Sequence, residues 1–211
     1  MIVKSFELGK IDYNKKLFLF YGENQGHKNQ IIEEKFKKKY RECTYSYDEG
    51  EVLNKKEVFF NNILSKSFFE EEKLIIINRA TDKIKDIIEE IIEKEITDLI
   101  LVLNSNTLEK KSKLRILFEK NKKTICVPFY DDNDQTLSSI VNTFFGEKKI
   151  NISQQLVNLI ISRSRGDRQN LNNELQKIEG FIKGKKKIDM QDILKLTNLA
   201  ENYNVSELID S

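Results

Sequence analysis

The stretch that most constrains the fold of this chain is residues 16–40, KLFLFYGENQGHKNQIIEEKFKKKY. Leu17–Phe20 is an unbroken apolar run, which is typical of a strand buried on both faces of a parallel sheet. Beyond a turn at Gly22, apolar side chains recur at helical spacing, and charged residues occupy most positions between them. These apolar residues are Ile31, Ile32, Phe36 and Tyr40. A buried strand, a glycine turn and an amphipathic helix predict the beginning of an α/β domain.

The same order of strand, turn and helix occurs in phosphate-binding loops, whose active form reads G-x-x-x-x-G-K-[ST]. There the backbone N–H groups hold phosphate, the Lys reaches the terminal phosphates and the hydroxyl binds magnesium. Here three residues separate Gly22 from Gly26, and His27 separates Gly26 from Lys28. Asn29 stands where the hydroxyl residue belongs. We therefore interpret Gly22, Gly26 and Lys28 as a degenerate phosphate loop, with an active P-loop NTPase as an alternative.

Strands and helices alternate through the next part of the chain. Further strands are predicted at Thr44–Tyr47, Leu74–Ile77, Leu99–Leu103 and Ile125–Phe129. Helices are predicted between them at Glu51–Leu64, Lys83–Lys94 and Lys110–Lys122. This alternation predicts right-handed βαβ units and an α/β fold class, with a parallel five-stranded sheet flanked by helices.

The chain changes character after Tyr130, where the polar link DDNDQ begins. No strand is predicted beyond it. Helices are predicted with Gly146 as a C-cap and with Ser153 and Asp167 as N-caps. A last short helix is predicted to open at Asp189. These elements predict a small all-α helical lid domain after the α/β domain.

The predicted domain boundaries follow from that change. We expect an α/β domain over residues 1–135 and a small helical domain over residues 136–203. Residues 204–211 contain VSELID, which is typical of the first turn of another helix. They are therefore interpreted as the start of a further domain.

The predicted strand ends lack the carboxylates that ATP hydrolysis needs. An ATPase of this layout ends a strand in Asp-Glu, which holds magnesium and activates water. The third strand is instead followed by Asn78 and Arg79, and the fourth by Asn104. Asn104 could contact a terminal phosphate, although an ordinary strand end is the favoured reading. We predict no catalytic residues and no cofactor.

Composition excludes several other classes. The net charge of +2 over 211 residues gives no overall basic bias toward nucleic acid. A single His and two separated cysteines, Cys43 and Cys126, predict no metal site and two buried free thiols in a reducing, cytoplasmic setting. No apolar run approaches the length of a membrane span.

Residues 67–72, SFFEEE, form a candidate interaction site. Phe68 and Phe69 are adjacent at a predicted helix end, immediately before three carboxylates. Adjacent helical residues point about 100° apart, so one inner face does not hold both rings comfortably. An exposed Phe would resemble an anchor for a pocket on a partner, and the alternative is that both rings pack in the core.

Four segments in this order resemble the delta subunit of the bacterial DNA polymerase III clamp loader. They are LFLFYGENQGHKNQIIEEKF, SFFEEEKLIIINRA, DLILVLNSNTLEKKSKL and ISRSRGDRQNLNNELQKIEGF. The family's helix that begins Gly-Asp is similar to Gly166, Asp167, Leu171, Glu174, Leu175 and Lys177. Its apolar helix end before a polar turn is similar to Ser67, Phe68 and Phe69.

The resemblance implies an AAA+-like fold that has lost its ATP site. It implies a subunit without catalysis in the DNA polymerase III holoenzyme, which binds the sliding clamp (beta) and helps open it for loading on primed DNA. The clamp-binding residues would be Phe68 and Phe69, with Ser67 and Leu64, although Lys66 replaces an apolar residue common in the family. The family also has a collar domain, expected to begin at about Val205, that joins the gamma/tau and delta prime subunits.

A nucleic-acid-binding module is a further alternative. It rests on the basic stretches Lys183–Lys187 and Lys148–Lys149. Because phosphate contacts give a steep dependence on salt, a salt titration of duplex binding would separate such a module from a protein binder.

Overall fold

The computed structural model describes residues 1–4, 7, 16–65, 72–96, 98–182, 191, 193 and 196. It divides into two compact units, of which the first is Met1–Tyr130 and the second begins at Asp131. Each unit has its own apolar core, and each is described by itself. Within the described ranges, no helix is long and apolar enough to cross a membrane.

The first unit is built on a five-stranded sheet in the order β2-β3-β4-β1-β5. The strands are β1 (Leu17–Tyr21), β2 (Thr44–Asp48), β3 (Lys73–Asn78), β4 (Leu99–Asn104) and β5 (Thr124–Pro128). All neighbouring pairs are parallel. The five predicted strands and the parallel sheet are thus confirmed, with ends that shift by a residue or two.

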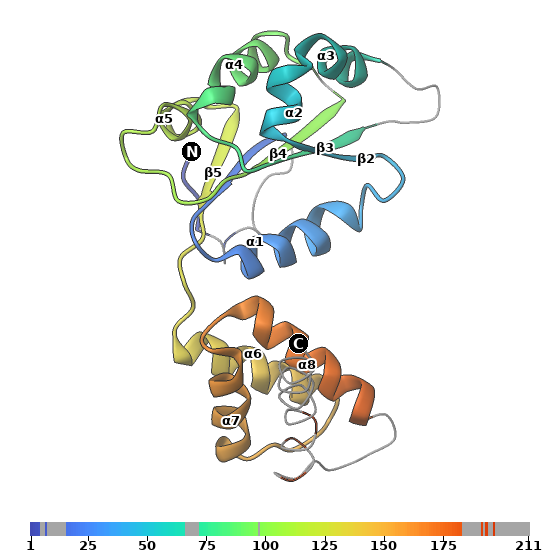
Figure 1. Ribbon diagram of the computed structural model, residues 1–211, viewed down its shortest axis with the longest axis vertical. Helices are drawn as coiled ribbons and strands as arrows, with labels where there is room; N and C mark the ends of the chain where they lie inside the picture. The colour runs from blue at the N-terminus through green and yellow to red at the C-terminus, as the bar shows by residue number, and fades with distance from the viewer. Residues whose placement is uncertain are drawn as a thin grey trace, which may run out of the picture. The chain divides into compact units, whose positions relative to one another are not determined.

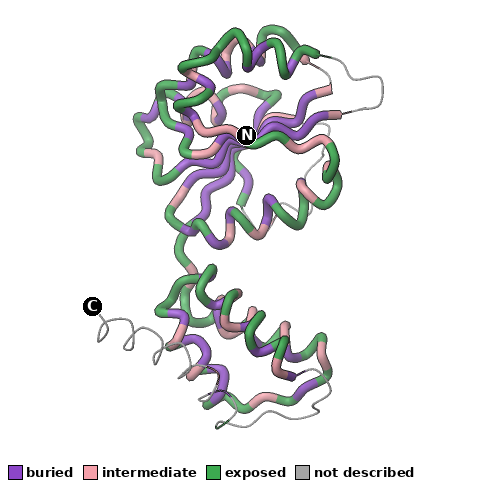
Figure 2. Tube along the Cα trace, turned by 45° about the vertical axis from the view of Figure 1, so that its right-hand side comes forward, coloured by how far each residue is buried: buried purple, intermediate pink, exposed green. Residues whose placement is uncertain are grey.

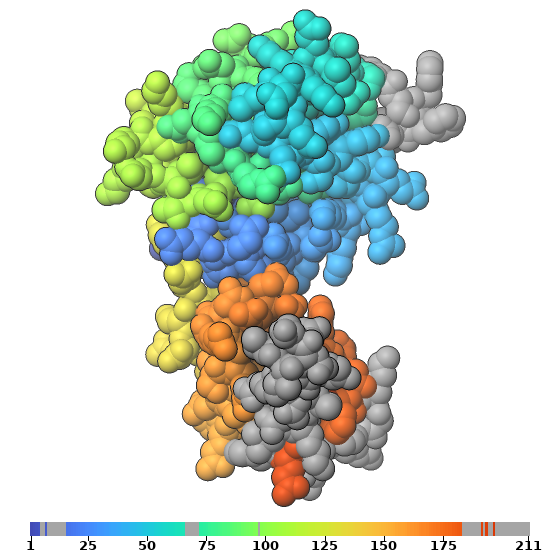
Figure 3. All heavy atoms as spheres, in the orientation of Figure 1, coloured from blue at the N-terminus to red at the C-terminus, as the bar shows by residue number. Residues whose placement is uncertain are grey.

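Helices cover both faces of this sheet (Figure 1). One layer consists of α2 (Glu49–Asn54), α3 (Lys56–Leu64), α4 (Lys85–Glu93) with the short 3-10 turn η3 (Asp82–Ile84), and α5 (Lys113–Lys120). The other face carries α1 (Gln25–Ile31), which continues as a π-helical stretch η2 (Ile32–Lys37). The side chains of α2, α3 and α4 form a continuous outer layer in the space-filling view (Figure 3).

The strands are buried because successive side chains enter different cores. In β1, Leu19 packs in the cluster beneath α2–α5, whereas Phe18 and Phe20 pack in the cluster beneath α1 and η2. The Phe18 ring lies 5.0 Å from the ring of Phe36 on η2. Such two-sided burial is the reason that these strands appear as continuous apolar runs in the sequence.

The segment predicted as one helix over Glu51–Leu64 is two helices. Lys55 leaves the helical region, with φ −129° and ψ 47°, and separates α2 from α3. The first of them begins earlier than predicted, because Asp48 and Glu51 form a capping box around its first turn.

The second unit is a helical bundle of α6 (Asp134–Glu147), α7 (Gln154–Ser164) and α8 (Arg168–Ile182) around a core of mainly aliphatic side chains (Figure 2). Ser153 caps α7 by accepting from the N–H of Leu156, as predicted. Asp167 caps α8 by accepting from the N–H of Asn170 at 2.7 Å, also as predicted.

The predicted C-cap at Gly146 is wrong. The helix α6 continues through Gly146 to Glu147, and the left-handed residue that follows is Lys149, with φ 57°. The N–H of Lys149 donates to the carbonyl of Gly146 at 3.0 Å, which closes the helix end. The predicted domain start at 204–211 and the basic stretch Lys183–Lys187 lie outside the described residues.

Candidate functional site

The turn between β1 and α1 is the first candidate site, and its shape depends on Gly22. Gly22 has φ +127°, a conformation that side chains rarely adopt. A Cβ added there would lie 2.1 Å from the carbonyl oxygen of Phe129, at the end of β5. The glycine therefore allows two strand ends to approach closely.

Asn24 fixes the entry into α1. Its Oδ1 accepts from the N–H of His27 at 2.9 Å, and its Nδ2 donates to the carbonyl of Tyr130 at 3.0 Å. The His27 ring packs against Phe129, with ring centroids 5.0 Å apart. The turn is thus held from both sides by its own residues and by the chain that leaves β5.

Lys28 points into this turn and is fully buried. Its Nζ donates to the carbonyl oxygen of Gly22 at 2.8 Å and to that of Ser105 at 2.6 Å. Burial lowers the pKa of the Lys28 ammonium to about 8. The ammonium that a phosphate loop would offer to a nucleotide is instead bonded to the protein's own backbone.

Several backbone donors of the turn are also occupied. The N–H of Gly22 donates to the carbonyl of Asn106 at 3.2 Å. The N–H of His27 donates to the Asn24 side chain, and the N–H of Lys28 donates to the Asn24 carbonyl at 3.1 Å. A phosphate cradle needs such N–H groups directed at the ligand. The structure brings the predicted residues Gly22 and Lys28 together, while Gly26 lies buried within α1.

The carboxyl ends of β3 and β4 carry the neutral side chains of Asn78 and Asn104, which form a row with Ser46 inside β2. Asn104 donates from Nδ2 to Oδ1 of Asn78 at 3.3 Å, and Asn78 donates from Nδ2 to Oγ of Ser46 at 3.0 Å. Among the described residues, Oδ1 of Asn104 and Oγ of Ser105 are buried without a hydrogen-bond partner. The row offers amides and hydroxyls where ATPases place a pair of carboxylates.

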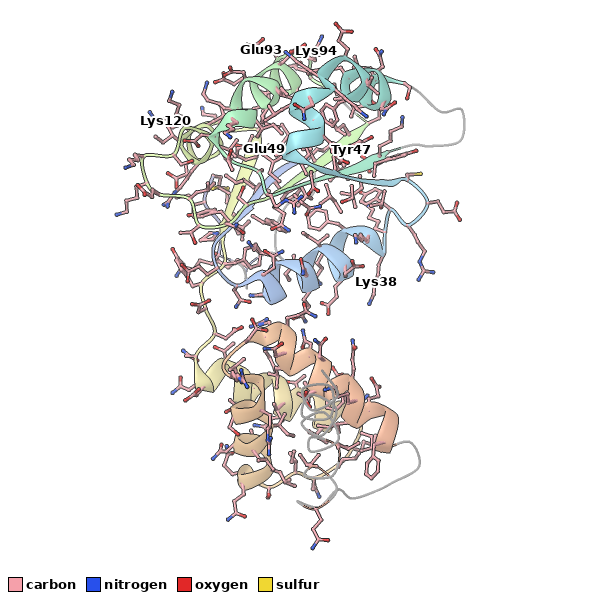
Figure 4. The ribbon with its side chains drawn as sticks, in the orientation of Figure 1. Lys38, Tyr47, Glu49, Glu93, Lys94 and Lys120 are labelled. Carbon is pink, nitrogen blue, oxygen red and sulfur yellow. The ribbon has the colours of Figure 1, made fainter. Side chains whose placement is uncertain are left out.

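Two carboxylates, those of Asp48 and Glu49, lie close to these residues in the sequence, and both form bonds within the protein. Asp48, at the end of β2, pairs with Arg79. Glu49, labelled on α2 in Figure 4, is buried and accepts from the N–H of Thr81 at 2.6 Å and from its hydroxyl at 2.9 Å. Among the residues that the structure describes, no group of three or more His, Cys, Asp or Glu side chains could hold a metal ion.

The end of α3 is the second candidate site. Leu64 is 46% exposed in the last turn of this helix. Ser67, Phe68 and Phe69 lie outside the described residues. The same helix buries two adjacent phenylalanines, Phe59 and Phe60, so adjacency alone does not require an exposed ring.

The cysteines and the basic residues are less informative. Neither cysteine forms a disulfide, and Cys126 is buried as predicted, whereas Cys43 is only partly buried, so its predicted burial is wrong. Lys148 pairs with Glu179 at 2.5 Å and lies over the Phe144 ring. This lysine is thus engaged within its own unit.

Comparison with known proteins decides the family. The family model described as DNA polymerase III, delta subunit, matches residues 18–129, which is more than half of the chain. The chain belongs to this family. The resemblance noted in the sequence is therefore confirmed. No curated protein sequence matches the chain significantly.

Solved structures agree on the fold of this family member. The Bacillus subtilis DNA clamp loader delta protein (YqeN) matches with a TM-score of 0.57 at 15% identity, over 91% of this chain and 60% of that chain. The Thermotoga maritima RuvB Holliday junction branch migration motor matches with a TM-score of 0.58 at 14% identity, over 92% of this chain and 65% of that one. The chain thus spans less than two thirds of either relative. These likenesses show an AAA+-like fold in which a helical part follows the sheet-containing part along the chain.

Proposed function

We propose that this delta-family chain binds the sliding clamp and helps open it for loading on primed DNA, without hydrolysing ATP itself. Membership of the family supports a role in DNA replication as a clamp-loader subunit. Its other partners would be the remaining loader subunits, reached through a collar domain. The domain boundaries proposed with this role are residues 1–135 and 136–203.

The buried Lys28 ammonium is the observation that carries the nucleotide part of the proposal. To bind ATP, Lys28 would have to break its bonds to the carbonyls of Gly22 and Ser105. The N–H groups of Gly22 and His27 would also have to leave their present acceptors. A buried acceptor that loses its donor costs about 1–3 kcal/mol, so ATP would have to repay several such losses. The neutral ends of β3 and β4 add no carboxylate that could bind magnesium and compensate for them.

The clamp part of the proposal rests on the end of α3. Leu64 is exposed there, and the chain continues into Ser67, Phe68 and Phe69, which we propose as the clamp-binding residues. An aromatic pair acts by differential binding when it fits the opened clamp edge better than the closed ring. The energy for opening then comes from binding, and ATP-driven steps belong to other subunits.

Two measurements on one preparation test the proposal. Calorimetry with ATP and magnesium should show no saturable binding below millimolar concentration, and surface plasmon resonance should show binding to the clamp from the same genome. Lys28→Met should leave clamp affinity within about twofold, because the ammonium of Lys28 bonds to Gly22 and Ser105 and not to the end of α3. Micromolar ATP binding would contradict the nucleotide part, and absence of clamp binding would contradict the clamp part.

A further inference from the structure

The chain passes from the first unit to the second between Tyr130 and Asp131. Its last residues in the first unit are held by β1 and by the turn that follows it. The N–H of Phe129 donates to the carbonyl of Tyr21 at 2.8 Å, and Nδ2 of the buried Asn24 donates to the carbonyl of Tyr130 at 3.0 Å. The chain is therefore fixed to the first unit as far as the peptide that joins Tyr130 to Asp131.

Beyond this point, Asp132 is fixed to the second unit. Its carboxylate accepts from Nε of Arg168 on α8 at 2.6 Å, and a second bond from the same guanidinium reaches its other oxygen. Both side chains are buried. The next residue, Asn133, caps α6 by accepting from the N–H of Thr136 at 2.8 Å. The second unit thus holds the chain from Asp132 onward.

Asp131 lies between these two anchors. It is exposed, and within the described part of the chain it forms no hydrogen bond or ion pair. Its N–H shares a rigid peptide plane with the Tyr130 carbonyl, which Asn24 holds. The backbone rotations left between the anchors therefore lie around Asp131. Hinges between domains are typically a few such residues at the ends of elements, where large changes in φ and ψ can be absorbed.

We propose that Asp131 is the hinge between the two units, and that Asn24 is the positioning residue that fixes where this hinge begins. The degenerate phosphate loop then has a structural role of its own. A single amide group in it holds both the first turn of α1 and the chain that leaves β5. Domains within one chain commonly move relative to one another, and the residues that bound a hinge decide which rotations are allowed.

Cleavage by chymotrypsin after Tyr130 tests the role of Asn24. The protease must take the Tyr130 carbonyl oxygen into its oxyanion hole, so the bond from Asn24 has to open first. The Tyr130 side chain is accessible, with 77% of the residue exposed. Asn24→Asp keeps an oxygen that can cap α1, but it replaces the NH₂ group that donates to Tyr130 by a second oxygen. Cleavage of this bond in the full chain, followed by mass spectrometry, should become about three- to tenfold faster.

Two further variants separate the hinge from other effects. Asn29→Asp is the matched control, because Asn29 is exposed on α1 and accepts from the Gln25 side chain at 3.0 Å. It should leave the rate of cleavage after Tyr130 unchanged. Asn24→Ala removes the cap of α1 together with the hinge bond, so it should also melt at a lower temperature than Asn24→Asp. Faster cleavage in Asn24→Ala but not in Asn24→Asp would assign the effect to the cap and overturn the inference.

Nitrogen-15 relaxation tests the hinge in the parent protein without any substitution. The amide of Asp132 belongs to the peptide between the anchors, and its order parameter should fall below roughly 0.6, whereas those of Val127 in β5 and Thr136 in α6 should stay near about 0.85. In Asn24→Asp the amide of Asp131 should lose order as well. An Asp132 amide as ordered as Val127 and Thr136 would overturn the hinge, and unchanged order at Asp131 in Asn24→Asp would overturn the role of Asn24.

Discussion

The ammonium of Lys28 lies 2.6 Å from the backbone carbonyl oxygen of Ser105, a residue 77 positions later in the chain. A second bond reaches the carbonyl of Gly22 at 2.8 Å. The side chain therefore connects the ends of β1 and β4 from inside the turn. In this family member a lysine that could have contacted phosphate has become part of the core.

Titration of Lys28 should be visible in the stability of the protein. Burial lowers its pKa from 10.5 to about 8, so the unfolded state binds more protons than the folded state between these values. Stability from this group therefore rises as pH increases from about 8 to about 10.5. The free energy of unfolding of the parent, minus that of Lys28→Met, should increase by up to roughly 3 kcal/mol across that window.

Urea unfolding followed by circular dichroism at several pH values would measure this difference. Burial also raises the pKa of Tyr21 and of Cys126 to about 12. Both groups are present in the parent and in the variant, so their alkaline titration cancels in the subtraction. A difference that stays flat between pH 7 and 10 would contradict the prediction.

Gly22→Ala should destabilise the first unit strongly. The substitution combines a φ of +127° with a Cβ placed 2.1 Å from the Phe129 carbonyl, so we expect a loss of roughly 3 kcal/mol or more. Gly50→Ala is the matched control, because Gly50 lies in α2 with open space around it. It should stabilise the protein by about 0.5–1 kcal/mol. If both substitutions shift the melting temperature in the same direction, this prediction is contradicted.

The pair between Asp132 and Arg168 should dominate the stability of the second unit. Both side chains are buried, with 5% and 8% exposed, and Nε of Arg168 donates to Oδ2 of Asp132 at 2.6 Å. Removing one partner leaves a buried charge, so Asp132→Ala should cost about 3–5 kcal/mol. Lys148→Met removes the more exposed pair with Glu179 and should cost about 1 kcal/mol or less.

Hydrogen exchange resolved by element suits this prediction, because the two units need not unfold together. Amides of α7 and α8 should lose protection in Asp132→Ala, while those of β3 and β4 keep theirs. Equal effects of Asp132→Ala and Lys148→Met on α7 and α8 would refute the role given to the buried pair.

Phe68→Ala and Phe69→Ala should each weaken clamp binding by roughly ten- to a hundredfold, as interface anchors do. The double substitution should abolish binding at micromolar concentration. Val58→Ala, which truncates an apolar side chain 54% exposed on α3, is the control and should bind normally. Melting temperatures belong to the same experiment, since a core phenylalanine would cost about 3–5 kcal/mol on truncation. A folded double variant with unchanged affinity would end the assignment.

The strands of the sheet could be predicted because a strand that is buried on both faces needs apolar side chains at successive positions. Leu74–Ile77 is such a continuous apolar run. Caps such as Ser153 and Asp167 were predictable because their partners lie within one helical turn. The break at Lys55 carries no Gly or Pro, and nothing local distinguishes it from a continuous helix.

For the turn between β1 and α1, the sequence allowed only the prediction that an active phosphate loop is incomplete. The spacing of Gly22, Gly26 and Lys28 indicates that a phosphate loop is incomplete, but a lysine normally remains in water. Its burial depends on the Ser105 carbonyl, which the fold brings close from another strand. The ion pair between Asp132 and Arg168 was not predicted either, because the two residues are 36 positions apart in the sequence and only the fold brings them together. Long-range polar partners follow from the fold and leave no local pattern.

The beginning of the chain has a consequence for β5, one outer strand of the sheet. The amino group of Met1 donates to the Thr124 carbonyl at 3.1 Å, and Cys126 exchanges backbone bonds with Met1 and Val3. Pro128 has no N–H to offer. The outer strand on the opposite side of the sheet is β2. Another strand could pair with β5 only after it displaced Met1 and Val3, so the first residues of the chain protect this side of the sheet against edge-to-edge association.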